Sequence, residues 1–184
     1  MASTGSPDTR LIVIRGNSAS GKGTIAAGLR TRFGRGLALV GQDNLRRHVL
    51  RERDRPGAAS IGLIDQTARY CLDHGYHVVI EGIMHSDRYA DTLSSLLSDH
   101  RGISRCFYLD VPFEETLARH ATKPEADEVG EAELRQWWTP MDLLPHGVEE
   151  ILDHRGSADD HVGRILHATG LEEDPVSPGP GPGA

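Results

Sequence analysis

The residues best suited to chemistry by type and spacing lie close to the amino end of the chain. Gly16, Gly21 and Lys22 have the spacing G-x4-G-K, and the apolar run from Leu11 to Arg15 comes directly before them. Glycine permits turns that point several backbone N–H groups into one concavity, which is the arrangement that binds a polyphosphate. Lys22 adds a positive charge, and a helix that begins beside it adds the positive end of its dipole. The pattern therefore predicts a phosphate-binding loop between a strand and a helix.

The residues expected to contact the phosphates follow one another along this loop: Gly16, Asn17, Ser18, Ala19, Ser20, Gly21, Lys22, Gly23 and Thr24. Such loops usually carry a serine or threonine directly after the lysine, where the hydroxyl binds Mg²⁺. Here Gly23 takes that position, and the hydroxyl comes one residue later, on Thr24. We therefore expect Thr24 beside the phosphates and treat it, together with Glu81, as a candidate metal ligand.

The length and composition agree with a small enzyme of one domain. The 184 residues suffice for one ordinary domain with its own core. The formal net charge of −7 disfavours a nucleic-acid scaffold, because lysine and arginine supply most of the non-specific affinity for phosphate backbones. Cys71 and Cys106 lie in apolar runs, so buried free thiols are expected rather than a disulfide. The ten histidines lack the paired spacing of a zinc site.

No segment of the sequence indicates a membrane or a secretory route. The apolar stretches are all shorter than the roughly 20 residues that a membrane-spanning helix needs. Residues 1–9 lack the basic and apolar regions of a secretion signal. We therefore expect a cytoplasmic protein without membrane contact.

Strand-like and helix-like runs alternate along the chain, which is the pattern of a parallel sheet covered by helices. The expected strands are Leu11–Arg15, Leu37–Val40, Tyr76–Ile80, Ile103–Leu109 and Val148–Leu152. The expected helices are Lys22–Phe33, Asn44–Arg53, Ile61–His74, Ser86–His100, Pro112–His120, Glu131–Trp138 and Ala158–Thr169. We predict an α/β fold of three layers, α/β/α, with a five-stranded parallel sheet in residues 10–171. A flexible start (1–9) and a disordered tail rich in proline and glycine (172–184) flank it.

Acidic side chains follow three of the predicted strands. Asp43 comes after the second strand, Glu81 after the third and Asp110 after the fourth. Ligands of such sheets gather at the carboxyl ends of the strands, where carboxylates suit Mg²⁺ binding and proton abstraction. Each residue also has a structural alternative: Asp43 as a helix N-cap, Glu81 as the partner in a buried salt bridge, and Asp110 at a helix start.

The order of these motifs is similar to that of the small P-loop kinases. The chain combines the phosphate loop with Asp43-x-x-Arg46, then Glu81-Gly82, then YLDVPFEETLARH, each after a predicted strand. This resembles the group that includes shikimate and gluconate kinases, chloramphenicol phosphotransferase, zeta-toxin kinases and polynucleotide 5′-hydroxyl kinases, over most of residues 11–169. The Gly-Lys-Gly-Thr ending of the loop resembles that of adenylate kinases. The resemblance implies a P-loop kinase fold with a helical lid.

The resemblance also implies ATP and Mg²⁺ as cofactors and gives roles to the matching residues. Asp43 would accept the proton of the attacking hydroxyl, and Arg46 would bind the acceptor or the transferring phosphoryl group. The implied catalytic residues are Lys22, Asp43, Arg46 and Arg119. The implied acceptor-binding residues are Asp43, Arg46, Arg47 and Glu81.

The segment of about residues 119–138 resembles the lid of these kinases. A lid closes over the nucleotide, excludes water and brings cations to the transferring phosphoryl group. Arg119 is the first candidate for that role, with Lys123 as a further nucleotide-binding residue. The alternative for Arg119 is a solvated helix end. Trp137 and Trp138 are expected to pack within the lid or to line the acceptor pocket.

The expected function is that of an ATP-dependent kinase that transfers the γ-phosphoryl group to a hydroxyl of a small molecule. Three alternatives remain open: a nucleoside monophosphate kinase, a polynucleotide 5′-hydroxyl kinase and a non-catalytic ATP-binding switch. The polynucleotide kinase would need a basic channel near Arg46 to Arg55 and would bind in a salt-sensitive way. The Asp-x-x-Arg pattern concerns the acceptor and favours a small hydroxyl compound, so nucleic acid is not the favoured partner.

Overall fold

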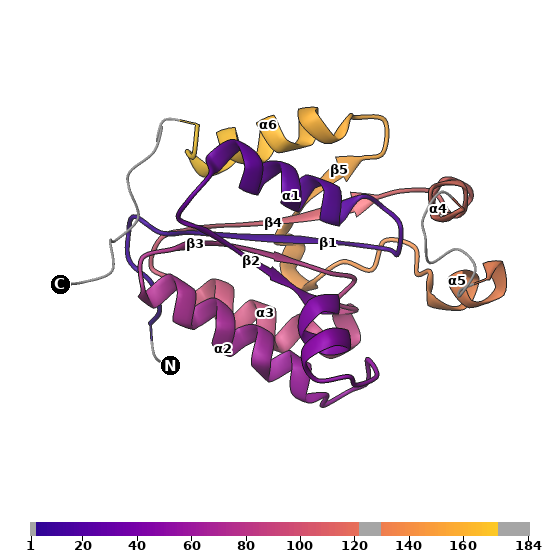
Figure 1. The fold of residues 1–184 in the computed structure, drawn as a ribbon, viewed down its shortest axis with the longest axis horizontal. Coiled ribbons are helices and arrows are strands. Elements are labelled where there is room, and N and C mark those ends of the chain that lie inside the picture. Colours follow the sequence, from indigo (N-terminus) through magenta and orange to yellow (C-terminus); the bar gives the residue numbers. More distant parts are fainter. Residues whose placement is uncertain (1–2, 122–129, 173–184) are drawn as a thin grey trace.

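The described chain is built on one parallel sheet. The structure is a computed structural model that describes residues 3–121 and 130–172. The strands lie in the order β2-β3-β1-β4-β5, and all neighbouring strands are parallel (Figure 1). Their bounds are β1 Arg10–Gly16, β2 Leu37–Gly41, β3 His77–Glu81, β4 Ile103–Asp110 and β5 Glu149–Asp153. The predicted five-stranded parallel sheet is therefore confirmed.

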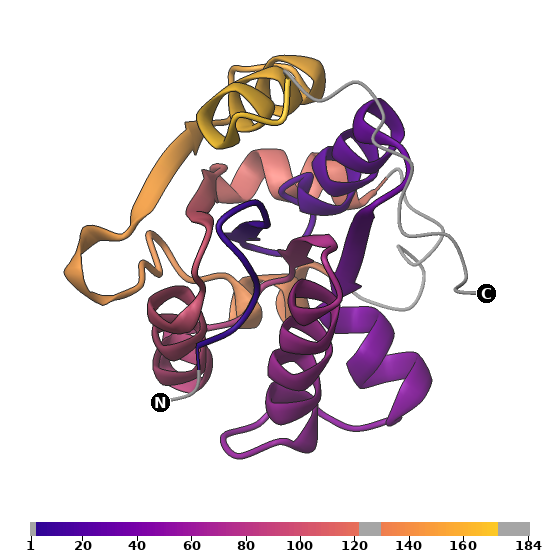
Figure 2. The same ribbon diagram turned by 90° about the vertical axis from the view of Figure 1, so that its left-hand side faces the viewer.

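Helices cover both faces of the sheet. Their bounds are α1 Lys22–Phe33, α2 Ala59–Asp73, α3 Ser86–Asp99, α4 Phe113–His120, α5 Glu131–Trp137 and α6 Ala158–Thr169. Figures 1 and 2 show α1 and α6 on one face and α2 and α3 on the other, which confirms the three layers. Within the two described ranges, none of the helices combines the length and the apolar character that a bilayer crossing requires.

Strand β1 lies at the centre of the sheet and joins the two halves of the core. Its successive side chains point to opposite faces. Leu11 and Val13 pack in the cluster that α2 and α3 complete, whereas Ile12 and Ile14 pack in the cluster that α1 and α6 complete. All four are fully buried. This two-sided burial explains why the first strand reads as a continuous apolar run instead of an alternating one.

The expected helix Asn44–Arg53 is the element that the sequence predicted wrongly. The structure has a short π-helix, η1, over Asn44–Val49, followed by irregular chain. The N–H of Leu50 donates to the carbonyl oxygen of Leu45, five residues back, which is the wider π-type turn. Arg51 then takes a left-handed conformation with φ 53°, which ends the helix.

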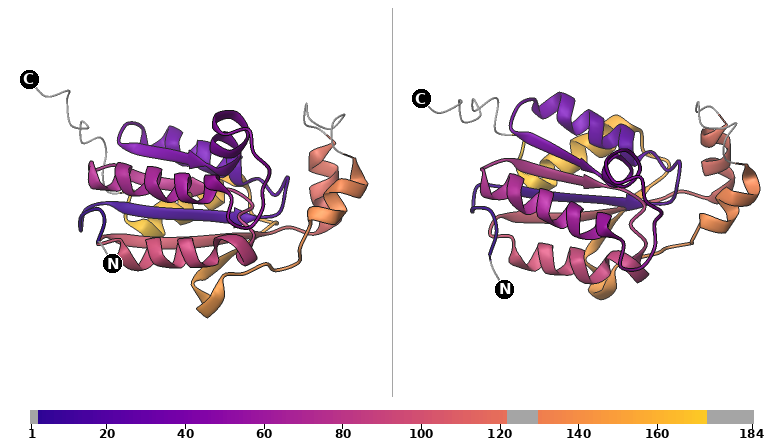
Figure 3. Two further views of the ribbon diagram at one scale, coloured as in Figure 1. Left: turned by 90° about the horizontal axis from the view of Figure 1, so that it is seen from below. Right: turned by 60° about the horizontal axis from the view of Figure 1, so that its bottom comes forward.

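Helices α4 and α5 form a small body beyond the carboxyl ends of the strands (Figure 3). They pack through Phe113: the Trp138 ring lies edge-on to it with centroids 5.9 Å apart, and the Arg135 guanidinium lies 4.2 Å from the Phe113 centroid. Trp138 therefore packs between the two helices, whereas Trp137 is 38% exposed. Residues 122–129, with Lys123 among them, lie outside the described residues.

Both cysteines are free thiols, but only one is buried. Cys106 is buried in β4, and Cys71 in α2 is only partly buried. Burial raises the pKa of the Cys71 thiol, and it raises the pKa of Cys106 further, where the nearby Glu149 carboxylate also contributes. Both therefore stay protonated at neutral pH and pack as small apolar groups.

Candidate functional site

The loop between β1 and α1 has the backbone that the glycine pattern predicts. Gly16 has φ 146°, and a Cβ placed there would lie 2.8 Å from the carbonyl oxygen of Leu109. Gly21 has φ 106° and precedes the first helical residue, Lys22. Ala19 also takes positive φ, 58°. The loop therefore turns tightly round a concavity. At Gly16 it packs closely against Leu109 of β4.

The amino end of α1 is left open for an anion. Its first turn carries no acidic residue, and no side chain caps it. The opposite arrangement is present in α6, where Ser157 and Asp160 form a capping box and Asp159 adds a further negative charge. First-turn N–H groups have no acceptor within their own helix and attract negative charge. The end of α1 therefore suits a phosphate group, whereas the end of α6 is already satisfied.

Lys22 lies against the same loop. Its Nζ donates to the carbonyl oxygen of Asn17 at 2.6 Å and to the Ser20 hydroxyl at 3.2 Å. Only 7% of the residue is exposed. The ammonium group is thus held over the loop, where it would reach an anion bound by the loop amides.

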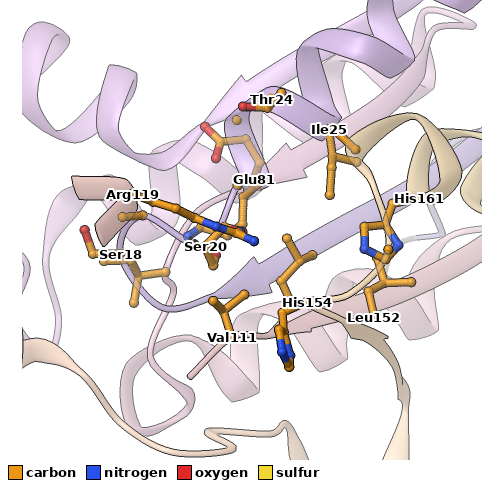
Figure 4. Close-up of a pocket in the computed structure, with 18 of the residues that line it drawn as sticks. Ser18, Ser20, Thr24, Ile25, Glu81, Val111, Arg119, Leu152, His154 and His161 are labelled. Atoms are coloured by element: carbon orange, nitrogen blue, oxygen red, sulfur yellow. Dashed lines mark hydrogen bonds between the residues drawn. The ribbon is translucent and has the colours of Figure 1, made fainter. Parts of the chain in front are cut away.

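A cavity of about 730 Å³ opens at the carboxyl ends of the strands. The phosphate loop lines it, together with Asp43, Glu81 and Arg119. His154, after β5, and His161, in the first turns of α6, line it as well (Figure 4). Its size is that of an ordinary small-molecule site. Four of the predicted functional residues, Lys22, Asp43, Glu81 and Arg119, therefore lie on one cavity.

Oxygen ligands suited to Mg²⁺ face this cavity. Thr24, Asp43 and Glu81 all line it, beside Lys22. Hydroxyl and carboxylate oxygens are the ligands that Mg²⁺ prefers, and Mg²⁺ keeps several waters and substrate phosphates in its shell. No group of three or more His, Cys, Asp or Glu side chains within residues 3–121 and 130–172 could hold a metal by itself. The residues therefore fit a metal that bound phosphates would help to hold, with Thr24 and Glu81 as the candidate ligands from the protein.

Asp43 is paired with two arginines instead of capping a helix. Its Oδ1 accepts from Arg46 Nη2 at 2.7 Å, and Arg47 Nε lies 3.3 Å from the same oxygen. The backbone of Asp43 is helical, and its side chain makes no cap hydrogen bond, so the N-cap alternative is wrong. The next residue back, Gln42, is buried, donates to the Tyr89 hydroxyl at 2.9 Å and accepts from the N–H of Met84 at 3.1 Å. This amide fixes the end of β2, and with it the position of Asp43.

Arg119 reaches the phosphate loop from α4. Its Nη1 donates to the carbonyl oxygen of Ser20 at 2.8 Å, and its Nη2 pairs with Glu115 one helical turn earlier. The other oxygen of Glu115 lies 3.8 Å from His154 Nε2. Arg119 is therefore not a fully solvated helix end, and one carboxylate orients it.

The structure uses two further residues that the sequence did not single out for this purpose. The side-chain amide of Asn17 donates to the Thr139 carbonyl oxygen at 2.8 Å and accepts from the Thr139 N–H at 3.0 Å. Arg15, fully buried, pairs with Glu149 at 2.8 Å and with Asp142 at 3.0 Å. The two hydrogen bonds between Asn17 and Thr139 fasten the chain after α5 to the phosphate loop.

The Arg15 cluster secures the strand that leads into the loop. Arg15 also donates twice to the Met84 carbonyl oxygen, at 2.8 and 2.9 Å. Asp142 accepts from the Ser86 backbone N–H at 2.9 Å. Although burial alone would raise its pKa, hydrogen bonds from His85 and Ser86 and the Arg15 charge hold the pKa of Asp142 well below its usual range. A charged residue inside an apolar run was the one sequence signal for this cluster.

Other predicted residues lie at the margin of the site. Leu109 and Val111 line the cavity, and Asp110 between them does not. Arg46 and Arg47 both pair with Asp43, and Asp43 lines the cavity.

Comparison with known proteins agrees with this geometry. The family described as AAA domain matches residues 11–143. No curated protein gives a significant match. Among solved structures, the APS kinase of Mycobacterium tuberculosis, in complex with AMPPNP and APS, superposes with TM-score 0.67 at 17% identity, covering 88% of this chain and 98% of that one.

Two further structures have the same fold. A gluconokinase from Sinorhizobium meliloti superposes with TM-score 0.62 at 14% identity, covering 92% of this chain and 94% of that chain. The tunicamycin resistance protein of Deinococcus radiodurans gives TM-score 0.62 at 19% identity, with coverage of 89% and 96%. The similarity to small P-loop kinases expected from the motifs is thus confirmed at the level of the fold.

Proposed function

Because the chain belongs to the AAA domain family and has the fold of small P-loop kinases, we propose that it is an ATP-dependent kinase. It transfers the γ-phosphoryl group of ATP to a hydroxyl of a small molecule. One observation carries the proposal: Lys22, Asp43 and Arg119, from three separate segments, line a single cavity beside a phosphate-binding loop. Phosphate binding needs the loop and the lysine, and a carboxylate and a second cation on the same cavity suit proton transfer and charge stabilisation.

The loop amides, the open end of α1 and Lys22 bind the β and γ phosphates of ATP. Lys22 leaves its contacts with Asn17 and Ser20, since the phosphate oxygens offer a charge-assisted hydrogen bond. Mg²⁺, when bound, would supply positive charge that offsets the negative charge of the phosphates. Thr24 and Glu81 are the residues that would hold it.

The transfer step breaks one P–O bond and forms another. The acceptor hydroxyl oxygen attacks the γ-phosphorus as the bond to the β–γ bridging oxygen breaks, and ADP leaves with the electron pair of that bond. Asp43 orients the hydroxyl and receives its proton. Both arginines bind Oδ1, so within the described part of the chain Oδ2 is the oxygen available for the acceptor. Arg119 offsets negative charge on the transferring group.

The test is transfer of labelled γ-phosphate from ATP, with Mg²⁺, to pooled hydroxyl metabolites, nucleoside monophosphates and 5′-hydroxyl oligonucleotides. We expect label on a small hydroxyl compound. Asp43→Asn should lower the transfer rate about 10² to 10⁴-fold and leave ATP affinity within a few-fold. Asp91→Asn, which changes an exposed carboxylate on α3, is the matched control.

Two outcomes would contradict the proposal. Tight ATP binding without transfer to any pool would favour the non-catalytic switch. Undiminished transfer by Asp43→Asn would exclude Asp43 as the proton acceptor.

A further inference from the structure

Two glycines make room for side chains of the neighbouring strand at the ends of β2 and β3. Gly41 is the register partner of Glu81, and a Cβ placed on Gly41 would lie 3.0 Å from Glu81 Oε1. A Cβ placed on Gly82 would lie 2.5 Å from the Cβ of Gln42, well inside the roughly 3.5–4.0 Å at which carbon atoms pack. The Glu81 carboxylate therefore lies against β2, and the Gln42 side chain lies against the chain that follows β3.

The buried amide of Gln42 has partners on two other elements. Its Nε2 donates to the Tyr89 hydroxyl on α3 at 2.9 Å, and its Oε1 accepts from the N–H of Met84 at 3.1 Å. All three residues are buried. A buried amide that is bonded at both ends holds one position, because leaving either end unpaired is costly. The chain directly before Asp43 is therefore fastened both to α3 and to the turn after β3.

The turn after β3 depends on this amide. Met84 takes φ 45°, a left-handed conformation that a residue with a Cβ keeps only when the surrounding contacts hold it there. Gln42 binds its N–H, and Arg15 donates twice to its carbonyl oxygen, at 2.8 and 2.9 Å. Residues 81–83 line the cavity directly before this turn. One side chain on β2 thus supports the turn through which the chain leaves the cavity.

The Tyr89 hydroxyl extends the network to the chain after η1. It accepts from Gln42 and donates to Asp54 Oδ1 at 3.1 Å, while Asp54 Oδ2 accepts from Arg88 at 2.9 Å. Burial, and then the Asp54 charge, raise the pKa of Tyr89 to about 12, so the hydroxyl keeps its proton and donates at neutral pH. One buried hydroxyl thus joins the residues on either side of Asp43 and η1.

From these contacts we propose that Tyr89 and Gln42 are positioning residues of the transfer step. Neither lines the cavity, but together they set where Asp43, the proposed proton acceptor, lies relative to Glu81 and the phosphate loop. A misplacement of about 1 Å at the reacting groups can lower a rate about 10²-fold. The inference rests on the proposed kinase function and adds two buried residues to those on which its rate depends.

A purely structural role predicts a different result. Removing a buried hydroxyl that is hydrogen-bonded lowers stability wherever it lies, and lower stability by itself leaves the rate of the folded molecules unchanged. A positioning role lowers that rate and spares ATP binding. Rate, ATP affinity and stability measured on the same variants therefore separate the two roles.

The first test removes the hydroxyl alone. Tyr89→Phe should lower the single-turnover rate of transfer from ATP to the pooled hydroxyl metabolites about tenfold to 10²-fold, while the Kd for ATP changes by a few-fold at most. The matched control is Thr169→Val, which removes a buried hydroxyl bonded to two carbonyl oxygens at the end of α6, beside Arg10 at the start of β1. It should lower the free energy of unfolding in urea and leave the rate unchanged.

A double-mutant cycle tests whether the two residues act together. Gln42→Met keeps the length of the side chain and removes both hydrogen bonds of the amide, so it should lower the rate at least as far as Tyr89→Phe does. The loss in the double variant should fall well short of the product of the two single losses, because the contact between them is already gone. Fully multiplied losses would show that Tyr89 does not act through Gln42, and would overturn the pair.

A second experiment needs no acceptor. Exchange of backbone amide hydrogens is followed in peptides that cover residues 41–47 and 81–85. We expect Tyr89→Phe to speed exchange in both peptides, and Thr169→Val to leave it as it was.

A pair of glycine variants checks the same network from the strand ends. Gly82→Ala places a Cβ against Gln42 and should lower the transfer rate and speed exchange, as Tyr89→Phe does. Gly62→Ala, in α2, meets nothing within 4 Å and should change neither.

The outcomes distinguish this inference from the kinase. Undiminished transfer by Tyr89→Phe, or unchanged exchange in both peptides, overturns the positioning role while the kinase stands. A loss of ATP affinity as large as the loss of rate overturns it as well, since the network would then serve the nucleotide. Absence of transfer by the unchanged protein overturns the kinase and this inference with it.

Discussion

The guanidinium of Arg119 donates to the backbone carbonyl oxygen of Ser20 at 2.8 Å, so α4 touches the phosphate loop directly. The partner of Arg119 is a main-chain oxygen of the loop, which a bound polyphosphate would outcompete for a guanidinium. Glu115 holds the second nitrogen and keeps the group aimed in this direction. The contact holds the Arg119 guanidinium beside the phosphate loop. Its partner there is a neutral carbonyl oxygen, which the guanidinium can exchange for a phosphate oxygen.

Replacing Arg119 should therefore affect the reaction more than binding. Arg119→Gln is expected to lower kcat about 10² to 10³-fold, because charge on the transferring group loses its cation, while the Kd for ATP changes by a few-fold at most. Single-turnover kinetics and equilibrium binding measure the two separately. Arg32→Gln, an exposed change near the end of α1, serves as the control, and equal losses in kcat and ATP affinity would argue against the assigned role.

The displaced hydroxyl of the loop gives a second prediction. Thr24→Val removes it and should raise the Mg²⁺ concentration for half-maximal activity about tenfold. A Cβ at Gly23 would meet nothing within 4 Å, so Gly23→Ser should fold and gain roughly 0.5 kcal/mol in the free energy of unfolding from helix propensity. If the Thr24 hydroxyl binds Mg²⁺, adding Gly23→Ser to Thr24→Val should not bring the Mg²⁺ concentration for half-maximal activity back to its original value. Full restoration would mean that the usual position works here too.

The buried Arg15 cluster predicts a large loss of stability. Arg15→Met leaves the carboxylates of Glu149 and Asp142 without their cation, and breaking a buried pair in this way costs about 3–5 kcal/mol. Urea unfolding measures it. Arg69→Met breaks a more exposed arrangement with Asp65 and Asp99 and should cost about 1 kcal/mol or less. A loss for Arg15→Met no greater than for Arg69→Met would show that the cluster adds little.

His100 predicts a specific dependence of stability on pH. Burial, and then the charges of Arg10 and His77, lower its pKa from 6.5 to about 4, while Thr9 and Ser104 bind its ring nitrogens at 2.9 and 2.8 Å. The unfolded chain therefore binds the proton more readily, and stability present above pH 6.5 is lost as the pH falls toward 4. The contribution is at most about 3 kcal/mol.

Chemical unfolding between these pH values isolates the effect. His100→Gln should flatten the slope relative to the unchanged protein, whereas His48→Gln, which alters an exposed imidazole, should leave it as it was. Parallel curves for all three proteins would contradict the assignment. Acidic groups with lowered pKa, such as Glu52 and Asp73, act at lower pH and appear equally in each curve.

Local signals in the sequence were sufficient for the sheet and the loop, and they failed where long-range pairing decides. The spacing of Gly16, Gly21 and Lys22 is typical of a phosphate-binding loop, and the runs on either side form the strand and the helix that such a loop needs. The segment after β2 lacked such a signal. Its arginine-rich sequence is compatible with a helix, but Glu52 instead caps α2, and this contact keeps the segment from continuing as a helix.

The same reason explains the residues that sequence reasoning did not assign. Arg15 is separated by 127 and 134 positions from the acids it binds, and Asn17 by 122 from Thr139. No periodicity links such positions. The side chain of Asn17 reads as part of the phosphate loop, and only the folded chain shows that it is engaged by Thr139.

The pair of hydrogen bonds between Asn17 and Thr139 has a thermodynamic consequence. The polypeptide that carries Arg119 at one end and Thr139 at the other is tied to the phosphate loop at both places. ATP bound in this loop would change the free energy of the contacts that Arg119 and Thr139 make with it. Linkage requires the reverse effect to be equal: whatever factor ATP contributes to forming these two contacts, the formed contacts return as tighter binding of ATP.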